Sequence, residues 1–282
     1  MKTFYLKSKS ATKTTKLVQI SDSHIIAVDK TDVVYYKKEK ERKSFFEREA
    51  LARTGEVHYA EEKLAEAVEY ALSADLTLFT GDIIEFPTRA NVDLMMKHFA
   101  PLKNYLYTFG NHDYLDSSLP FTPQEQLERN LPLFKSAISN DLEIAIKEVN
   151  GINVVLLDNG RFQFNERQYQ ELKKVFDQGK DVIIGMHIPL FHPDLDQAGL
   201  EKVKNATDVC GTDKDESKDC YPTKITKAVL DLIKEKHEQV LALLVGHNHF
   251  DAVIDYYKDI KMYVCLPTYL NDFYEFIIEP KK

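Results

Sequence analysis

An α/β fold is predicted for this 282-residue chain from the order of its apolar segments. Six short runs rich in β-branched residues have the length and composition of buried strands, at residues 16–21, 75–81, 105–110, 152–158, 181–187 and 239–246. Between several of them, apolar residues recur at the three-and-four spacing of amphipathic helices, at 60–74, 166–178 and 222–236. Alternating strands and helices predict a sheet that is buried on both faces.

The pattern changes to strands alone near the end of the chain, at 251–258, 261–267 and 273–280. Neighbouring strands without a helix between them pair antiparallel, so we expect mixed sheets instead of a purely parallel one. Two segments fit neither pattern: residues 25–59 are charged and predicted to form a helical excursion, and 189–221 a long polar loop. Such segments are frequently lids or binding loops. We therefore expect one domain over 1–282, with lid or substrate-loop excursions at 25–59 and 189–221.

Composition narrows the class of protein and partner. The hydrophobic content of 44% is enough for one sizeable core, and the net charge of −8 makes a nucleic-acid partner unlikely, because phosphate contacts need a basic face. No run approaches the roughly 20 apolar residues of a membrane span. Three cysteines form no disulfide framework and the first sixteen residues lack a signal peptide's apolar stretch, so a cytoplasmic location is expected. Pairing of Cys210 with Cys220 stays open.

Five predicted strands are followed by side chains that can bind metals. The sequences at these strand ends are Asp22-Ser23-His24, Gly81-Asp82, Gly110-Asn111-His112-Asp113, Met186-His187 and Gly246-His247-Asn248-His249. Ligand sites of open α/β sheets lie at the carboxyl ends of strands, so these side chains can converge. Glycine before a ligand lets the backbone turn sharply out of the strand.

The chemistry of this set favours a pair of metal ions. It combines two aspartates, one asparagine and four histidines: Asp22, His24, Asp82, Asn111, His187, His247 and His249. Mixed imidazole and carboxylate ligands suit Mn, Fe, Zn, Co or Ni better than Ca or Mg. No cysteine accompanies them, which argues against a closed structural zinc site. Seven ligands are too many for one catalytic ion and fit two ions, which in such enzymes lie about 3.5–4 Å apart.

The order of these motifs closely resembles the calcineurin-like metallophosphoesterase superfamily over residues 22–249. The resemblance implies a four-layer αββα sandwich, with two mixed sheets packed between helices and a dinuclear site at the strand ends. It implies that the first ion is bound by Asp22, His24 and His249, and the second by Asn111, His187 and His247. Asp82 would bridge both ions, and His112 would stay off the metals and face the phosphate.

The resemblance also implies hydrolysis of a phosphate ester by in-line attack of a hydroxide that bridges the ions. An alkoxide is a poor leaving group, so we expect His112 to act as the acid, with Asp113 supporting its protonated form. Purple acid phosphatases of this superfamily carry a tyrosine three residues after the bridging aspartate, where this chain has Glu85. We therefore expect two divalent ions, Mn or Fe first, and Glu85 close to the ligands without being one.

Several functions share these seven ligands. We favour a phosphodiesterase acting on a small molecule such as a cyclic nucleotide, and a phosphomonoesterase and a nuclease remain alternatives. A non-catalytic scaffold is less favoured, because such a chain should have lost ligands or the off-metal histidine. His58, His98 and His237 lie in charged helical surroundings and are predicted to be solvated.

Overall fold

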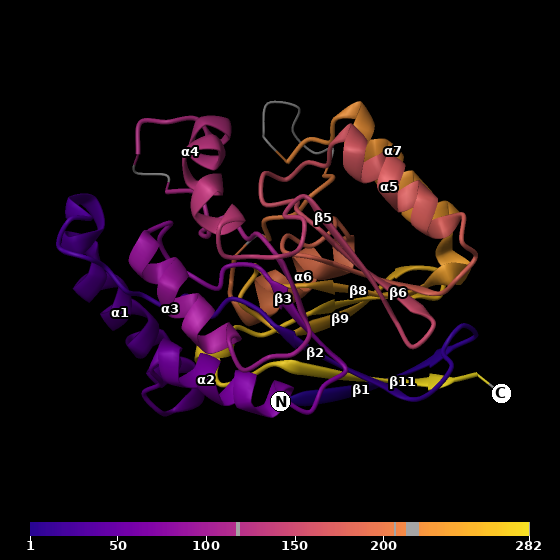
Figure 1. The fold of residues 1–282 in the computed structure, drawn as a ribbon, viewed down its shortest axis with the longest axis horizontal. Helices are drawn as coiled ribbons and strands as arrows, with labels where there is room; N and C mark the ends of the chain where they lie inside the picture. The colour runs from indigo at the N-terminus through magenta and orange to yellow at the C-terminus, as the bar shows by residue number, and fades with distance from the viewer. Residues whose placement is uncertain (117–118, 206, 213–219, 282) are drawn as a thin grey trace.

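The computed structural model describes residues 1–116, 119–205, 207–212 and 220–281 (Figure 1). The described strands are β1 (Lys2–Ser8), β2 (Thr15–Ile20), β3 (Leu76–Thr80), β4 (Tyr105–Thr108), β5 (Ile144–Val149), β6 (Ile152–Leu157), β7 (Val182–Met186), β8 (Val240–Val245), β9 (Ala252–Tyr257), β10 (Ile260–Val264) and β11 (Tyr274–Pro280). The helices are α1 (Val33–Thr54), α2 (Ala60–Ala71), α3 (Arg89–Phe99), α4 (Pro123–Lys135), α5 (Glu166–Phe176), α6 (Pro193–Lys202) and α7 (Lys224–Glu235). All six predicted internal strands and all three predicted helices are confirmed.

The strands form two mixed sheets, as expected. One has the order β1-β11-β2-β3-β4 and the other β5-β6-β7-β8-β10-β9. The three C-terminal strands are present, but their pairing is more varied than the antiparallel arrangement that we predicted. β9 and β10 do pair antiparallel, whereas β10 also runs parallel to β8. β11 joins the other sheet, between β1 and β2, and lies parallel to β1.

Alternate residues along each strand belong to different hydrophobic cores. Leu17 and Leu156 point into the core between the two sheets. Val18 packs toward α2, α3 and α4 on the outer face of the first sheet. Val155 packs toward α5 and α7, which lie side by side on the outer face of the second sheet in Figure 1. This period of two confirms the four-layer αββα arrangement, and each such buried side chain contributes about 1.5–3 kcal/mol.

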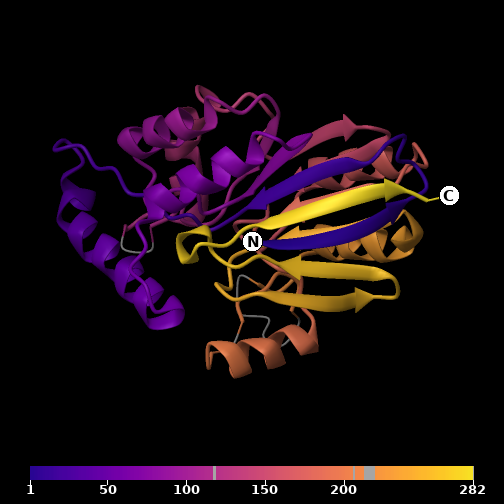
Figure 2. The same ribbon diagram turned by 90° about the horizontal axis from the view of Figure 1, so that it is seen from below.

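The two excursions are more structured than the sequence pattern indicates. The segment 25–59 contains α1, as expected, and Gly55 ends this helix in the left-handed region at φ 83°. The segment 189–221, predicted to be a loop, contains α6, whose N-cap is His192. Residues 213–219 of that segment lie outside the described residues. Figure 2 shows α1 and α6 projecting from different sides of the sheets.

Some local features correct the sequence-based expectations. β1 and β5 were not predicted, because exposed positions interrupt their apolar pattern. His58 is buried and not solvated. Cys210, Cys220 and Cys265 are free thiols. Among the described helices, none has the length and apolar character needed to cross a bilayer.

Candidate metal centre

The predicted ligands meet where the two sheets present the carboxyl ends of their parallel strands. β2, β3 and β4 run parallel in one sheet, and β7 and β8 run parallel in the other. Each of these five strands ends within two residues of one motif, and backbone hydrogen bonds join the segments that follow the strands. The N–H of Asp22 donates to Gly81 O at 3.0 Å, and the N–H of Gly246 donates to His187 O at 2.9 Å. The topology therefore gathers residues that are more than 200 positions apart.

The first cluster of metal-binding side chains consists of Asp22, His24 and His249. Nε2 of His24 lies 3.1 Å from Nε2 of His249, and the latter atom lies 3.4 Å from Oδ1 of Asp22. His24 and Asp22 are buried. Two imidazole nitrogens and a carboxylate oxygen thus face one small volume, as ligands of a single cation do.

A second cluster consists of Asp82, His187 and His247. Nε2 of His187 lies 3.1 Å from Oδ2 of Asp82 and 3.2 Å from Nδ1 of His247. The same Asp82 oxygen lies 3.9 Å from Nε2 of His24 in the first cluster. Asp82 is therefore the carboxylate that faces both clusters, which is the position required of a bridging ligand.

Asn111 is the remaining candidate ligand, and it offers a side-chain amide oxygen. Its Oδ1 is buried and accepts no hydrogen bond among the described residues. A buried polar atom without a partner costs about 1–3 kcal/mol, so such an atom calls for a ligand. Together with the opposed imidazole nitrogens, this orphaned oxygen shows that the residues fit a pair of cations.

The backbone at the ligands is strained. Asp22, His24, Asp82, His247 and His249 all have positive φ, between 49° and 71°. Such backbone conformations are uncommon for residues other than glycine, although Asp, Asn and His adopt them more readily than most. Residues held in this region cluster at functional sites, where the surrounding structure imposes the conformation.

Three glycines allow the close approach of these ligands. A Cβ at Gly110 would lie 2.1 Å from Oδ1 of Asp82, and one at Gly246 would lie 2.3 Å from Oδ2 of Asp22. A Cβ at Gly81 would lie 2.4 Å from the backbone N of Gly110. Only Gly81 has a positive φ, at 89°. At the other two positions the need is for space and not, as the sequence argument held, for a sharp turn.

The carboxylates of the site require a nearby positive charge. Burial opposes protonation of His187, yet the carboxylates of Asp82 and Asp22 outweigh it and raise its pKa to about 9. Burial likewise opposes ionisation of Asp82, but the charges of His187 and His112 hold its pKa well below the ordinary value. A metal cation would compensate the charge of these carboxylates in place of the proton on His187.

The structure corrects our expectation for Asp113. Its carboxylate does not face His112, because it accepts four backbone N–H bonds of 2.7–3.1 Å, from Asp82, Ile83, Ile84 and Gly110. Burial and the charge of Asp82 raise its pKa to about 7. Asp113 therefore braces the loops after β3 and β4 and so positions Asp82.

Glu85 is the carboxylate that faces His112. Its Oε2 lies 2.7 Å from Nδ1 of His24 and 3.4 Å from Nδ1 of His112, and its Oε1 accepts from Nε of Arg42 at 2.5 Å. Glu85, His24 and His112 form a third cluster of potential metal ligands. The hydrogen bond to His24 and the contact with His112 account for their closeness without a cation. The sequence pattern gave no sign of the contact between Arg42 and Glu85, because α2 and β3 lie between the two residues in the chain.

The comparisons with known proteins agree with this geometry. The model of the calcineurin-like phosphoesterase family matches residues 15–251, which is most of the chain. The chain belongs to the calcineurin-like phosphoesterase family. It is thus a hydrolytic phosphoesterase, as the motif order predicted. A comparison with curated protein sequences gives no match.

Solved structures show the same fold at low sequence identity. A dimetal phosphatase from Danio rerio is 15% identical with a TM-score of 0.54, and the match covers 92% of this chain and 88% of that chain. A purple acid phosphatase from yellow lupin (Lupinus luteus) seeds is 11% identical with a TM-score of 0.56. That match covers 90% of this chain and 44% of the lupin chain.

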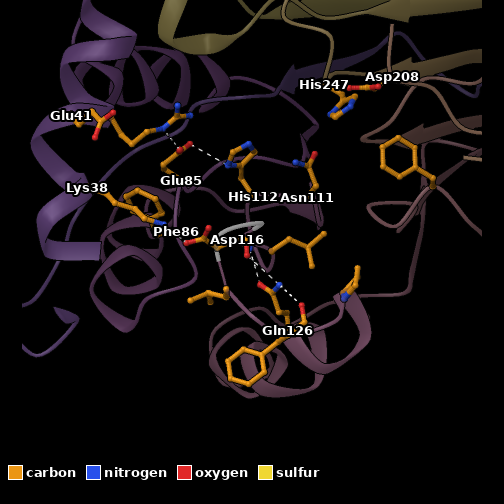
Figure 3. Close-up of a pocket in the computed structure, with 16 residues that line it drawn as sticks. Lys38, Glu41, Glu85, Phe86, Asn111, His112, Asp116, Gln126, Asp208 and His247 are labelled. Atoms are coloured by element: carbon orange, nitrogen blue, oxygen red, sulfur yellow. Dashed lines mark hydrogen bonds and ion pairs between the residues drawn. The ribbon is translucent and has the colours of Figure 1, made fainter. Parts of the chain in front are cut away.

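A pocket of about 650 Å³ opens beside the second cluster of this phosphoesterase. Asn111, His112 and His247 line it, and Figure 3 shows Lys38 and Glu41 of α1 on one side, with Asp208 on the other. Apolar side chains complete the walls: Phe86, Leu115, Leu119, Phe121, Pro123 and Phe162. The space adjoining the candidate ligands is therefore a partly open pocket with both polar and apolar walls.

Proposed function

We propose that this phosphoesterase is a metal-dependent phosphodiesterase that acts on a small molecule, such as a cyclic nucleotide. The observation that carries the proposal is the charge of the pocket. Among its described lining residues, the lysine and arginine side chains are Lys38 and Arg42, and each is paired with a carboxylate. Nζ of Lys38 lies 2.7 Å from Asp116, and Arg42 binds Glu85.

The charged side chains that line the pocket favour a substrate with one negative charge. Glu41 and Asp208 add two further carboxylates to the lining, so the pocket outside the ligand clusters is net negative. A phosphodiester carries one negative charge, whereas a monoester carries nearly two at neutral pH. Like charges repel in a partly enclosed site, so the second charge of a monoester is disfavoured. A nucleic-acid backbone would be disfavoured for the same reason.

The candidate ligands divide between two divalent cations. Asp22, His24 and His249 would hold one, Asn111, His187 and His247 the other, and Asp82 both. When bound, such ions supply Lewis acidity to the phosphoryl oxygens and lower the pKa of a water molecule that attacks phosphorus. Mn or Fe suits this donor set best, with Zn, Co or Ni as alternatives.

The side chains around the pocket would then handle the leaving group. His112 lines the pocket, and in our proposal it donates a proton to the departing alkoxide oxygen. Nδ1 of His112 faces Glu85, which leaves Nε2 for the ester. Glu85 thereby orients the imidazole ring of His112, the supporting position that we had assigned to Asp113.

Both excursions would shape the substrate's surroundings. The segment 25–59 contributes α1 with Glu41, and the segment 189–221 contributes Asp208. The apolar side chain of Phe162 lies beside His247, with ring centroids 6.0 Å apart, and would contact the organic part of the ester. In this proposal one domain carries both the ligand clusters and the residues that select the substrate.

The decisive experiment compares a diester with a monoester on the same protein. The chain is stripped of metal by chelation, reloaded with Mn, and assayed with bis(p-nitrophenyl) phosphate and p-nitrophenyl phosphate. We expect hydrolysis to depend on Mn, and kcat/KM for the diester to exceed that for the monoester at least about tenfold. Asp82→Asn is the matched inactive variant.

Other results would identify the alternatives. Preference for the monoester would indicate a phosphomonoesterase, and preference for long single- or double-stranded DNA a nuclease. Hydrolysis of neither ester by a protein that holds two ions would indicate a scaffold. A panel of cyclic nucleotides, dinucleotides, phospholipid head-group diesters and sugar phosphates then identifies the substrate class.

A further inference from the structure

Helix α1 lies against one side of the first cluster and has little core of its own. It projects at one end of the molecule in Figures 1 and 2. Of its residues, Phe46 and Ala50 alone are buried. Arg42, Phe46 and Glu49 are spaced by four and three residues and therefore share one face of the helix. Each of these three side chains contacts either a histidine of the first cluster or a residue that itself contacts one of these histidines.

Arg42 acts on His24 through Glu85. Its Nε donates to Oε1 of Glu85, while Oε2 of the same carboxylate accepts from Nδ1 of His24 at 2.7 Å. The bond to Glu85 fixes the His24 proton on Nδ1 and leaves the lone pair on Nε2. That nitrogen is the one that faces Asp82 and His249.

Phe46 holds the ring of His24 in place. The two rings stack with centroids 4.8 Å apart and planes 25° from parallel. Phe46 also packs against Tyr269 at 4.8 Å, so it joins the two histidine supports. Because it is buried, its packing fixes the plane in which the His24 lone pair points.

Glu49 acts on His249 through Tyr269. Oη of Tyr269 lies 2.8 Å from Oε2 of Glu49 and 3.1 Å from Nδ1 of His249. The phenol donates to the carboxylate and accepts from the imidazole N–H. This relay keeps the His249 proton on Nδ1 and leaves Nε2 for a cation, beside Asp22.

The second cluster has a different kind of support. Nδ1 of His187 donates to the backbone carbonyl of Thr80 at 2.8 Å, at the carboxyl end of strand β3. In the described structure, α1 supplies no hydrogen bond to His187 or His247. One cluster is thus held by the sheet itself and the other by an added helix.

From this asymmetry we infer that α1 is a clamp that sets the affinity of the first cluster, Asp22-His24-His249, for its cation. The inference rests on the proposed function in requiring that the clusters bind cations. Partners that orient a ligand histidine contribute about ten- to a hundredfold to metal affinity. Loss of the contacts from α1 therefore weakens the binding of the first-cluster cation selectively. The two cations of the pair then dissociate at different concentrations of free metal.

The test measures metal binding and not turnover. Arg42→Ala and Tyr269→Phe each break one link from α1 to a histidine. Arg48→Ala and Tyr36→Phe are the matched controls, since Arg48 is exposed and Tyr36 is 52% exposed on the same helix. Mn bound per chain is determined by equilibrium dialysis over a range of free Mn, and circular dichroism checks that the helix content is unchanged. Anomalous diffraction locates the retained ion.

We expect both test variants to bind one ion as the wild type does and the other about ten- to a hundredfold more weakly, with the retained ion at His187 and His247. The controls should match the wild type. Equal weakening of both ions, or no weakening of either, would overturn the role of α1. A wild-type protein that binds fewer than two ions would instead refute the proposed function.

Discussion

Oε2 of Glu85 lies 3.4 Å from Nδ1 of His112 and 2.7 Å from Nδ1 of His24, so one buried carboxylate serves a candidate ligand and the candidate acid at once. Arg42 occupies the other oxygen of the same group. The candidate acid His112 and the candidate ligand His24 therefore share one carboxylate partner. A substitution at either histidine should affect the other through Glu85.

Removal of the acid should affect esters according to their leaving group. His112→Ala should lower kcat for alkyl diesters about 10²–10⁴-fold, because an alkoxide needs a proton as it departs. For bis(p-nitrophenyl) phosphate, whose leaving group is stable as an anion, the loss should stay below about tenfold. The comparison is made on Mn-loaded protein with both substrates, and equal losses would exclude the acid role.

Asp82→Asn should release both ions together. Its Oδ2 faces His24 in one cluster and His187 in the other, so an amide there weakens both sets of ligands. Elemental analysis after dialysis against low Mn measures the effect, with wild-type protein treated in parallel. Retention of one ion at full occupancy would contradict the bridging position.

Gly110→Ala should disturb the ligands through its added Cβ. That atom would lie 2.1 Å from Oδ1 of Asp82 and 2.3 Å from its backbone N, which cannot move aside easily. We expect a destabilisation of about 1–3 kcal/mol in urea unfolding, together with weaker Mn binding. Gly179→Ala is the control, since its Cβ would meet nothing within 4 Å. It should cost about 1–2 kcal/mol through its φ of 70° and leave Mn binding unchanged.

Asp158 should make stability depend on pH. Burial raises its pKa from 3.8 to about 6, partly offset by a hydrogen bond from the Gly160 N–H and by the charge of Arg161. The folded state thus binds the proton more tightly than the unfolded state, and stability falls as pH rises from about 4 to about 6. Asp158→Asn removes this loss. It should match the wild type near pH 4 and exceed it by up to about 3 kcal/mol at pH 7, as measured by urea unfolding. A difference that does not change with pH would contradict this account.

A positive charge in the pocket should shift the preference toward monoesters. Glu41 lines the pocket from α1, so Glu41→Lys adds attraction for a second phosphate charge. An exposed pair of charges is worth about 0.2–1 kcal/mol, which predicts a rise of about 1.4- to fivefold in the monoester-to-diester ratio of kcat/KM. Glu39→Lys, which makes the same charge change on α1 outside the pocket lining, should leave the ratio unaltered. The same rise in both variants would mean that net charge and not position is responsible.

The sequence pattern predicted the strands that position the ligands because each carries its own signal. The strand Val182–Met186 is apolar throughout, and the candidate ligand His187 follows it directly, so the same stretch of sequence identifies both the strand and the residue. β1 has no such signal, since exposed residues such as Tyr5 interrupt it and its place in the sheet depends on pairing with the distant β11. Antiparallel pairing of the C-terminal strands was predicted from adjacency, which does not specify that β11 crosses to the other sheet.

The supporting contacts could not be predicted because they join distant parts of the chain. Glu49 and Tyr269 are 220 residues apart, and neither belongs to a motif. Asp113 was assigned to His112 because it is its neighbour in sequence, whereas the turn after Gly110 directs its carboxylate to backbone N–H groups instead. Local spacing identifies which residue types are present, and only the fold decides which of them touch.

The left-handed backbone at Asp22, His24, Asp82, His247 and His249 has a consequence for how this family could change over time. At roughly 1 kcal/mol or more for each residue, the five together cost an amount comparable with the whole stability of an ordinary domain. A related chain that no longer had to hydrolyse an ester could relax those loops and gain folding stability. In this chain the five conformations thus exchange folding stability for the placement of the candidate ligands.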